Sequence, residues 1–289
     1  MYTCRDYYEN KKRILSEKIS VRKTDITVPK VVIIQIGDEP ASNSYIKGKV
    51  KDCNDIGIEI EVLKYKLNAT QYQIERVVND LNHDDSVHGI VVQLPVPKWI
   101  NMESVRRIIS PKKDVDGFNP YSLFKPCTAL GIINYLKFNN YSFEGKAVTV
   151  IGRSMCVGHP LVDLLLDSNA TVTVCHSKSN PDHIKASIRH TDLVITSIDK
   201  IEYYKEGFFD DVVHPIDIID VGLGYGEDGK LHGNIEASYA KQLKERAEET
   251  GNYCISGING VGLLTRISLM HNIFDAYDNF IKDSKPYQF

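Results

Sequence analysis

Several features that mark whole classes of protein are missing from this chain. Its 289 residues contain six cysteines that lie far apart, with no C-x-x-C pair and no zinc-like spacing of cysteine and histidine. The nine histidines form no H-E-x-x-H motif. We therefore expect reduced cysteines that behave as small core residues, and no metal site.

Long apolar runs and an excess of positive charge are missing too. No apolar run reaches the length of a membrane span, and the charged N-terminal segment lacks the apolar core of a signal peptide. A net charge of -3 indicates no basic surface for nucleic acid. We expect a cytoplasmic protein with neither a membrane nor a nucleic acid as a partner.

What the chain does have is a regular alternation of short apolar runs and amphipathic stretches. The hydrophobic content of 42% is enough for a sizeable core. Strands are predicted at 31–36, 58–63, 88–94, 147–151, 171–175, 193–196 and 216–221. Helices are predicted at 42–56, 71–81, 158–167, 236–250 and 261–281, and a turn or hairpin tip at 222–229. This rhythm is typical of parallel sheets covered by helices on both faces, which makes the chain an α/β protein.

One lysine falls on the apolar side of the helix predicted at 42–56. At about 100° per residue, Lys49 points the same way as the apolar residues and follows Tyr45 by one turn. The apolar residues of that face are Tyr45, Ile46, Val50, Cys53 and Ile56. An inward ammonium needs a partner or a function, because burial disfavours the charged form. Lys49 is therefore a candidate for proton transfer, although it can also extend to the surface or pair with a carboxylate.

Two more polar residues stand at positions where α/β proteins bind ligands. Gln93 ends the run HGIVVQLPVP, at the carboxyl end of a predicted buried strand. Asp116 lies in the turn-forming segment KKDVDGFNP. Each also has an ordinary explanation, since Gln93 can satisfy loop backbone groups and aspartate is common in turns.

A strand-turn-helix segment, VTVIGRSMCVGHP, has the form of a dinucleotide site. Gly152 and Gly158 bracket its turn, and the N–H groups of the following helix can bind a phosphate. The motif is weak by itself because it is not G-x-G-x-x-G. The next strand ends in His176 and Ser177, without the acidic residue usual in NAD sites, which permits a 2′-phosphate and favours NADP.

These segments together predict two domains. We expect an N-terminal α/β substrate domain and a Rossmann-like, doubly wound NADP domain, with a ligand-binding cleft between them. The turn-rich loop 116–127 marks the boundary. Residues 1–126 with 262–289 are assigned to the substrate domain, and residues 127–261 to the NADP domain.

The chain resembles the bifunctional methylene-tetrahydrofolate dehydrogenase/methenyl-tetrahydrofolate cyclohydrolase family. The matching stretches are GDEPASNSYIKGKVKDCNDIGI, GIVVQLPVP, PKKDVDGFNP, PCTALGI, VIGRSMCVGHPLVDLLL and ATVTVCHS, and they occur in the family's order. The resemblance implies oxidation of methylene-tetrahydrofolate with NADP, followed by hydrolysis of the methenyl product to formyl-tetrahydrofolate. It also implies a small folate substrate, no metal, and a homodimer joined through the nucleotide domain.

The resemblance further implies a role for each matching position. Lys49 would be the catalytic lysine, assisted by Gln93, which hydrogen-bonds it, and by Tyr45, which stacks on the folate. Asp116 would bind the pterin end, and Gly262 would also contact the folate. The residues expected to bind NADP are Gly152, Arg153, Ser154, His176 and Ser177.

The resemblance breaks in two loops. The family signature proline-glycine-glycine-valine-glycine-proline-methionine-threonine becomes INGVGLLT at 258–265, and the loss of prolines is expected to loosen the loop. Ser197-Ile198-Asp199 replaces an alanine-x-glycine turn beside the dinucleotide, where Ile198 or Asp199 could obstruct NADP. Ala129 also replaces the last proline of the family's PCTP motif.

Three functions remain open at this point. They are a bifunctional enzyme, a cyclohydrolase that has lost its dehydrogenase step, and a non-catalytic folate-binding paralogue. The Tyr45-x-x-x-Lys49 spacing also occurs in short-chain dehydrogenases, but there the pair follows the nucleotide-binding half, whereas here it precedes it.

Overall fold

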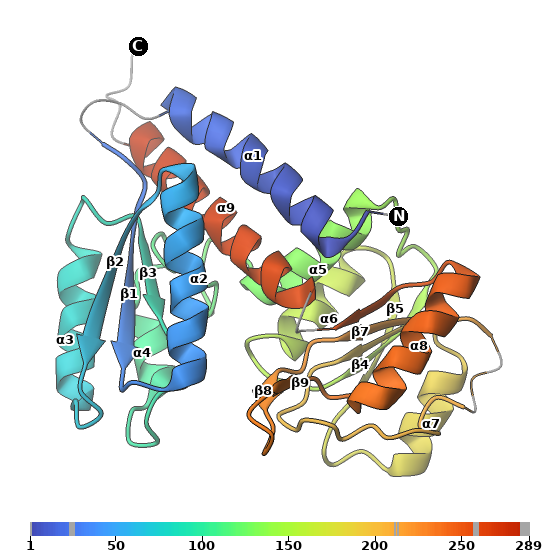
Figure 1. The fold of residues 1–289 in the computed structure, drawn as a ribbon. Coiled ribbons are helices and arrows are strands. Elements are labelled where there is room, and N and C mark those ends of the chain that lie inside the picture. Colours follow the sequence, from blue (N-terminus) through green and yellow to red (C-terminus); the bar gives the residue numbers. More distant parts are fainter. Residues whose placement is uncertain (1, 23–26, 211, 213, 257–259, 284–289) are drawn as a thin grey trace. The chain divides into compact units, whose positions relative to one another are not determined.

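A computed structural model describes residues 2–22, 27–210, 212, 214–256 and 260–283 (Figure 1). The chain divides into two compact units, which are described separately below. The three-stranded unit comprises residues 8–127 and 266–289, and the five-stranded unit comprises residues 1–7 and 128–265.

The three-stranded unit is built on a parallel sheet in the order β2-β1-β3. Its strands are β1 (Lys30–Ile36), β2 (Glu59–Tyr65) and β3 (Gly89–Val92), and the helices between them are α2 (Pro40–Ile56), α3 (Gln71–Asn82) and α4 (Met102–Ile108). Alternate side chains of β1, such as Val32 and Ile34, pack with Ile74 and Val78 of α3 and Val105 of α4. The chain reverses its direction across the sheet at β1, so ligands are expected beyond the carboxyl ends of β1 and β3.

The five-stranded unit is a doubly wound parallel sheet in the order β10-β7-β6-β4-β5. The strands are β4 (Ala147–Ile151), β5 (Thr171–Cys175), β6 (Leu193–Thr196), β7 (Asp217–Asp220) and β10 (Cys254–Ser256). A two-stranded hairpin, β8 (Gly224–Tyr225) with β9 (Leu231–His232), lies where a turn or hairpin was predicted. The switch in strand order falls between β4 and β6, which is where such sheets bind nucleotides.

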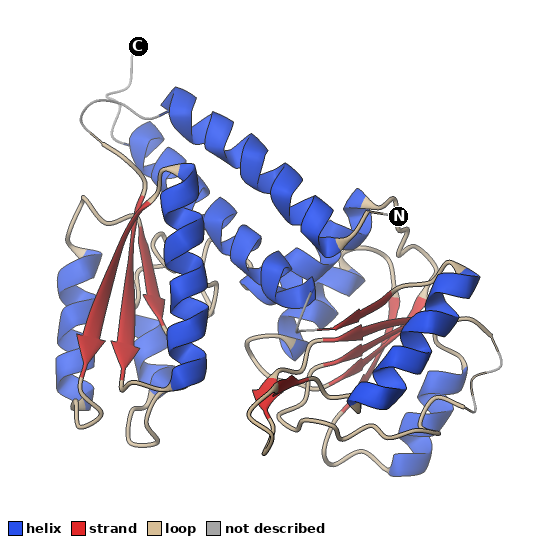
Figure 2. Cartoon of the chain, viewed as in Figure 1, coloured by secondary structure: helices blue, strands red, loops and turns tan. Residues whose placement is uncertain are grey.

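Helices cover both faces of the five-stranded sheet, as predicted (Figure 2). Helices α7 (Pro181–Arg189) and α8 (Ala237–Thr250) pack on one face through Ile188, Tyr239 and Leu243. Helices α5 (Cys127–Phe138) and α6 (Gly158–Leu166) lie over the other. Most predicted strands and helices are present with ends shifted by one or two residues, although β3 is shorter than its prediction and ends at Val92.

Two helices contribute residues to both units. Helix α1 (Cys4–Arg22) was not anticipated, because its charges obscure its apolar face, yet Leu15 and Ile19 on it are buried. Its first residues belong to the five-stranded unit, where Tyr7 packs edge-on against Tyr135. Helix α9 (Gly262–Asp283) passes from the five-stranded unit into the three-stranded unit after Thr265. The sequence-based boundaries fell after residues 126 and 261 and placed the whole N-terminus in the first domain.

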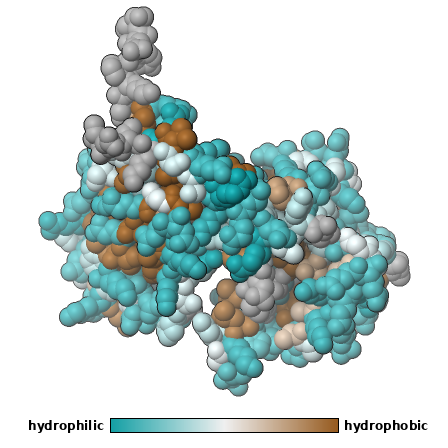
Figure 3. Space-filling view, turned by 45° about the horizontal axis from the view of Figure 1, so that its top comes forward, coloured by the Kyte–Doolittle hydropathy of each residue, from teal (hydrophilic) through white to brown (hydrophobic). Residues whose placement is uncertain are grey.

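No helix among the described residues is long and apolar enough to cross a membrane. Hydrophilic residues cover most of the face shown in Figure 3. All six cysteines are free, and four of them, including Cys53 and Cys127, are buried.

Candidate active site

Lys49 is buried on the inner side of α2, as its helical position predicted. The helix begins at Pro40, where the side chain of Glu39 accepts a hydrogen bond from the Ser42 N–H, and ends at Gly57 in a left-handed conformation. Lys49 is only 3% exposed, whereas Lys47 and Lys51 face solvent. Its Nζ lies 5.0 Å from the centre of the Tyr45 ring, a cation–π distance.

Gln93 supplies the hydrogen-bond partner of the lysine. The Nζ of Lys49 donates to Oε1 of Gln93 over 3.2 Å. The other end of the amide, Nε2, donates to the Leu94 carbonyl over 2.8 Å, which orients Oε1 towards the amine. The backbone N–H of Gln93 donates to the Ile34 carbonyl, so the residue sits beyond the carboxyl ends of β1 and β3.

The charge of Asp116 acts on a buried thiol, that of Cys127, on which the charge of Lys49 also acts. Burial raises the pKa of the Cys127 thiol well above its usual value, the Asp116 charge raises it further, and the Lys49 charge lowers it. Both charges therefore act on one buried thiol, which itself donates to the Val115 carbonyl at 3.3 Å. The structure thus brings Tyr45, Lys49 and Gln93 together within the three-stranded unit, and the charge of Asp116 acts on a thiol that also senses Lys49.

Two buried residues support the Asp116 loop; Asp114 was recognised from sequence only as a turn residue, and Asn272 was missed. Asp114 is 1% exposed and accepts the Asn119 N–H over 2.7 Å, and burial raises the pKa of its carboxyl to about 6. Asn272 of α9 donates to the Val115 carbonyl over 2.8 Å. A polar residue on the inner face of the 261–281 helix was the signal that could have revealed Asn272.

The strand-turn-helix after β4 has close backbone packing. Gly152 adopts a φ of 134°, and a Cβ there would collide with the carbonyl and hydroxyl oxygens of Ser197. A Cβ on Gly158 would similarly collide with the Gly152 carbonyl. Ser154 Oγ accepts the N–H groups of Val157 and Gly158 at 3.2 and 3.4 Å, at the start of α6.

Three turns meet at this edge of the sheet. The N–H of Gly152 donates to the Cys175 carbonyl, next to His176, and the N–H of Ser197 donates to the Ile151 carbonyl. Arg153 and Ser177 are exposed there. The predicted cofactor residues Gly152, Arg153, Ser154, His176 and Ser177 therefore gather where β4, β5 and β6 end.

A buried asparagine holds the backbone of the altered turn 197–199. Asn234, 1% exposed, accepts the Ile198 N–H and donates to the carbonyls of Ile198 and Lys200. Ile198 packs on the hydrophobic core, and Asp199 is exposed. Sequence reasoning missed Asn234, because only the fold brings it to this turn.

The geometry fits a dinucleotide. Glycines at 152 and 158 leave room that a side chain would fill, and the buried Ser197 hydroxyl has no hydrogen-bond partner among the described residues. Beside it, an open depression of about 580 Å³ is lined in part by Ile198, Asp199 and Tyr225. No group of side chains within the described ranges could hold a metal ion.

Gly262 lies at the start of α9 and belongs to the five-stranded unit, unlike the other residues expected to bind folate. Ile258 and Asn259 of the altered signature lie outside the described residues. Within the rest of that segment, Thr265 Oγ1 donates to the Val261 carbonyl over 3.0 Å and is also 3.1 Å from the Thr128 hydroxyl, a hydrogen-bond distance. Ala129, the substituted proline position, is fully buried in α5.

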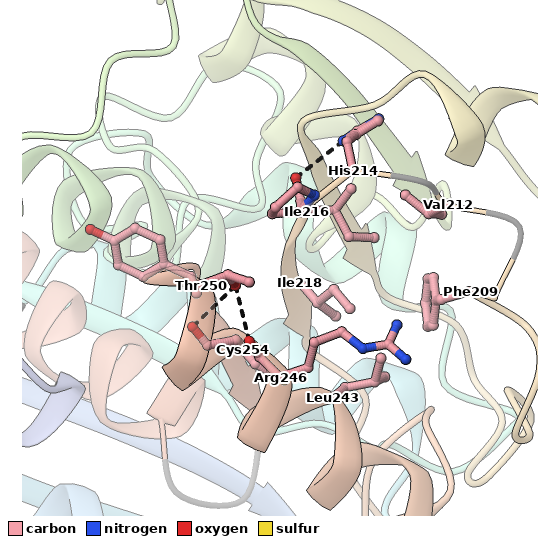
Figure 4. Close-up of a pocket in the computed structure, with 12 residues that line it drawn as sticks. Phe209, Val212, His214, Ile216, Ile218, Leu243, Arg246, Thr250 and Cys254 are labelled. Carbon is pink, nitrogen blue, oxygen red and sulfur yellow. Dashed lines mark hydrogen bonds between the residues drawn. The ribbon is translucent and has the colours of Figure 1, made fainter.

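A separate hollow of about 240 Å³ lies between α8 and the segment before β7 (Figure 4). Leu243 and Arg246 of α8 line it together with Phe209 and His214. It contains none of the residues predicted from sequence, so it is not part of the candidate active site.

Family models and a curated relative match nearly the whole chain. Residues 4–116 match the family described as "Tetrahydrofolate dehydrogenase/cyclohydrolase, catalytic domain", and residues 126–281 match its NAD(P)-binding domain. The chain is 36% identical over 282 residues to "Bifunctional protein FolD" of Bacillus cytotoxicus, covering 93% of each chain.

Solved structures agree. A bifunctional FolD enzyme from Campylobacter jejuni matches with a TM-score of 0.85 and 33% identity, over 94% of this chain and 96% of that one. A Trypanosoma brucei FolD, solved with NADP and an inhibitor, matches with a TM-score of 0.85 and 25% identity, over 98% of each chain. The chain belongs to the tetrahydrofolate dehydrogenase/cyclohydrolase family. It is a methylene-tetrahydrofolate dehydrogenase and methenyl-tetrahydrofolate cyclohydrolase of one-carbon metabolism with an NAD(P)-binding domain.

Proposed function

We propose that Lys49 is the central catalytic residue of both activities and that the three-stranded unit binds the folate. The observation that carries this proposal is a 3% exposed amine held by Gln93 and lying over the Tyr45 ring. A buried lysine without a carboxylate in hydrogen-bond contact exchanges protons more readily than one in an ion pair.

In the hydrolytic step, Lys49 would move protons as water adds to the methenyl carbon and the ring opens. Gln93 can only accept from the amine at Oε1, because its Nε2 is engaged by the Leu94 carbonyl. It therefore holds Nζ in place in either protonation state. The Tyr45 ring would stack on the folate, and Asp116 would accept hydrogen bonds from the pterin end.

NADP is the proposed cofactor of the five-stranded unit. When bound, it supplies the acceptor for the hydride that leaves the methylene carbon. The backbone around Gly152 and the start of α6 would hold its phosphates, with Ser154 shaping the turn. Arg153 and Ser177 are exposed where β4 and β5 end, and the residues directly after β5, His176 and Ser177, are not acidic, which favours the 2′-phosphate of NADP over NAD.

The placement of the altered turn supports the bifunctional enzyme over a cyclohydrolase alone. Ile198 packs inward on the core, and Asn234 holds the backbone on both sides of it. The exposed Asp199 remains the one charge at this turn that could weaken NADP binding.

We also propose a cytoplasmic homodimer joined through the five-stranded unit. Strand β5 is a free edge of the sheet, and its Thr171, Thr173 and Val174 are exposed. An exposed edge strand presents unpaired N–H and C=O groups that a second copy can satisfy.

The test of the catalytic role is the Lys49→Met variant. Hydrolysis of methenyl-tetrahydrofolate, followed by its absorbance, is expected to slow by about 10²-fold or more, because proton transfer is lost. Folate binding should persist, since Tyr45 and Asp116 are untouched. Lys47→Met, on the exposed side of the same helix, is the matched control and should retain full activity. If Lys49→Met turns over at the wild-type rate, the lysine is not catalytic.

A further inference from the structure

A second buried charge lies on α2, one turn after Lys49. Asp52 is 3% exposed. Its Oδ2 is 3.0 Å from Nε of Arg266 on α9, and its Oδ1 accepts a hydrogen bond from the hydroxyl of Tyr8 on α1. The three residues come from three helices of the same unit. A carboxylate this buried is stable only with such partners.

Arg266 lies directly against the Lys49 turn of α2. A Cβ on Gly48 would collide with Nη1 of Arg266, so the absence of a side chain at 48 is what admits the guanidinium. The guanidinium carbon is also 5.6 Å from the centre of the Tyr8 ring. The side chain of Arg266 therefore lies along α2 from Gly48 to Asp52, and Lys49 is on the turn between them.

The charges of Asp52 and Lys49 both act on the thiol of Cys53, the residue after Asp52. Burial raises the pKa of the Cys53 thiol to about 12, the Asp52 charge adds to the rise, and the Lys49 charge opposes it. Asp52 and Lys49 are three residues apart on one helix, which places them on neighbouring positions of its inner side. Among the described residues, the other charged or titratable groups around the pair include Tyr8 and Lys12 of α1, Tyr45 of α2, Arg266 of α9, and Asp116 and Cys127.

We propose that the buried Asp52–Arg266 ion pair positions the Lys49 turn of α2 and sets the proton affinity of the Lys49 amine. Asp52 and Arg266 are thus positioning residues that touch neither folate nor cofactor. Only the predicted effect on the rate of hydrolysis rests on the proposed catalytic role of Lys49. The ion pair and the contact of Arg266 with the Gly48 position, next to Lys49 in the chain, stand on the geometry alone.

Removing one charge at a time should move the Lys49 titration in opposite directions. Asp52→Asn leaves the Arg266 cation uncompensated, which disfavours the ammonium, so Lys49 should lose its proton at lower pH. Arg266→Met removes the nearer cation and leaves Asp52 with Lys12 alone, whose Nζ is 3.8 Å from Oδ1, so Lys49 should lose its proton at higher pH. Each shift is expected to be on the order of one pH unit, as for charges a few ångströms apart.

Two measurements on the whole chain test the proposal. After reductive methylation with ¹³C-formaldehyde, the Lys49 signal is identified by its absence in Lys49→Met, and its chemical shift is followed against pH. The pH profile of methenyl-tetrahydrofolate hydrolysis is recorded for the same variants. The limb of the pH–rate profile that depends on Lys49 should shift in the same direction as the NMR titration. In the variants, kcat should change more than KM.

Two further variants complete the test. The double variant, Asp52→Asn with Arg266→Met, removes both charges and should fold and titrate closer to wild type than either single variant. Arg13→Met breaks the exposed Arg13–Glu17 pair of α1, 2.7 Å long, and should leave the titration unchanged.

Opposite shifts in both measurements support the proposal. Shifts in the same direction, or an unmoved Lys49 titration in folded single variants, overturn it and leave the pair a structural contact. If the NMR titration moves as expected while Lys49→Met retains full hydrolysis, the ion pair is upheld and only the proposed catalytic role of Lys49 fails.

Discussion

At the scale of single residues, the proposed cofactor site depends on the backbone at Gly152, which has a φ of 134° and no room for a side chain. We expect Gly152→Ala to lower the free energy of unfolding by about 2 kcal/mol or more, through the collision with Ser197. NADPH affinity, measured by fluorescence titration, should fall more than tenfold. Gly251→Ala is the control, because Gly251 has a φ of 77° but no atom near its Cβ position. Unchanged NADPH binding by folded Gly152→Ala would show that this turn does not carry the dinucleotide.

The candidate site could be predicted in part, residue by residue. Lys49 was identifiable because a charge interrupts a periodic apolar face, which is visible within one helix. Asp52 lies on the same helix, but its partners Tyr8 and Arg266 come from opposite ends of the chain. No local pattern indicates that pairing, so the buried ion pair could not be inferred. Asn234 was missed for the same reason.

At the scale of elements, strands were predicted better than short helices. Buried parallel strands such as β1 are nearly continuous apolar runs that stand out in the sequence. Helices α4 and α7 are short, and α5 begins within the loop that was taken as the domain boundary. Their existence depends on packing against a sheet, which local sequence does not report.

We predict that the proposed homodimer forms through strand β5. Val174→Lys should convert the proposed dimer into monomers in analytical ultracentrifugation, because a lysine on an edge strand opposes pairing. Val174 is 40% exposed, so the fold should tolerate the change. Leu123→Lys, at a position 61% exposed in the other unit, should leave the dimer intact. A wild-type monomer at micromolar concentration, or a Val174→Lys dimer, would refute pairing through β5.

At the scale of the whole molecule, buried histidines make stability depend on pH. His88 is 4% exposed, its Nδ1 accepts the Lys30 N–H over 3.1 Å, and it packs edge-on against Tyr277 with ring centres 5.0 Å apart. Burial lowers the pKa of its imidazole from 6.5 to about 4. The folded state thus favours the neutral ring. The associated stability is complete above pH 6.5 and is lost as the pH falls towards 4.

We expect His88→Asn to remove this pH dependence. Between pH 6.5 and 4, the loss of unfolding free energy should be smaller than in wild type by about 3 kcal/mol, from the lowered pKa. Asparagine can still accept the Lys30 N–H, so the variant should fold, although it loses ring packing at neutral pH. Urea unfolding followed by fluorescence of Trp99, the single tryptophan, reports on this unit.

Other buried groups do not disturb that comparison. His271, with a pKa also lowered by burial to about 4, and Asp114, with a pKa raised to about 6, are present in both proteins. Their contributions cancel when the two curves are subtracted. His83→Asn, at an exposed position, should follow the wild-type curve. If the His88→Asn and wild-type curves run parallel between pH 6.5 and 4, the neutral ring of His88 does not stabilise the fold.

The sequence by itself determined the α/β class, the order of the principal strands, the inward position of Lys49 and the glycine turn at Gly152. Each of these depends on residues close together in the chain, where periodicity and backbone conformation act. The family resemblance also predicted the hydrogen bond between Gln93 and Lys49. Only the tertiary structure decided that Asn234 carries the altered turn and that Asp52 meets Arg266. These contacts join distant segments, and they form because burial makes every polar group find a partner wherever the fold brings one.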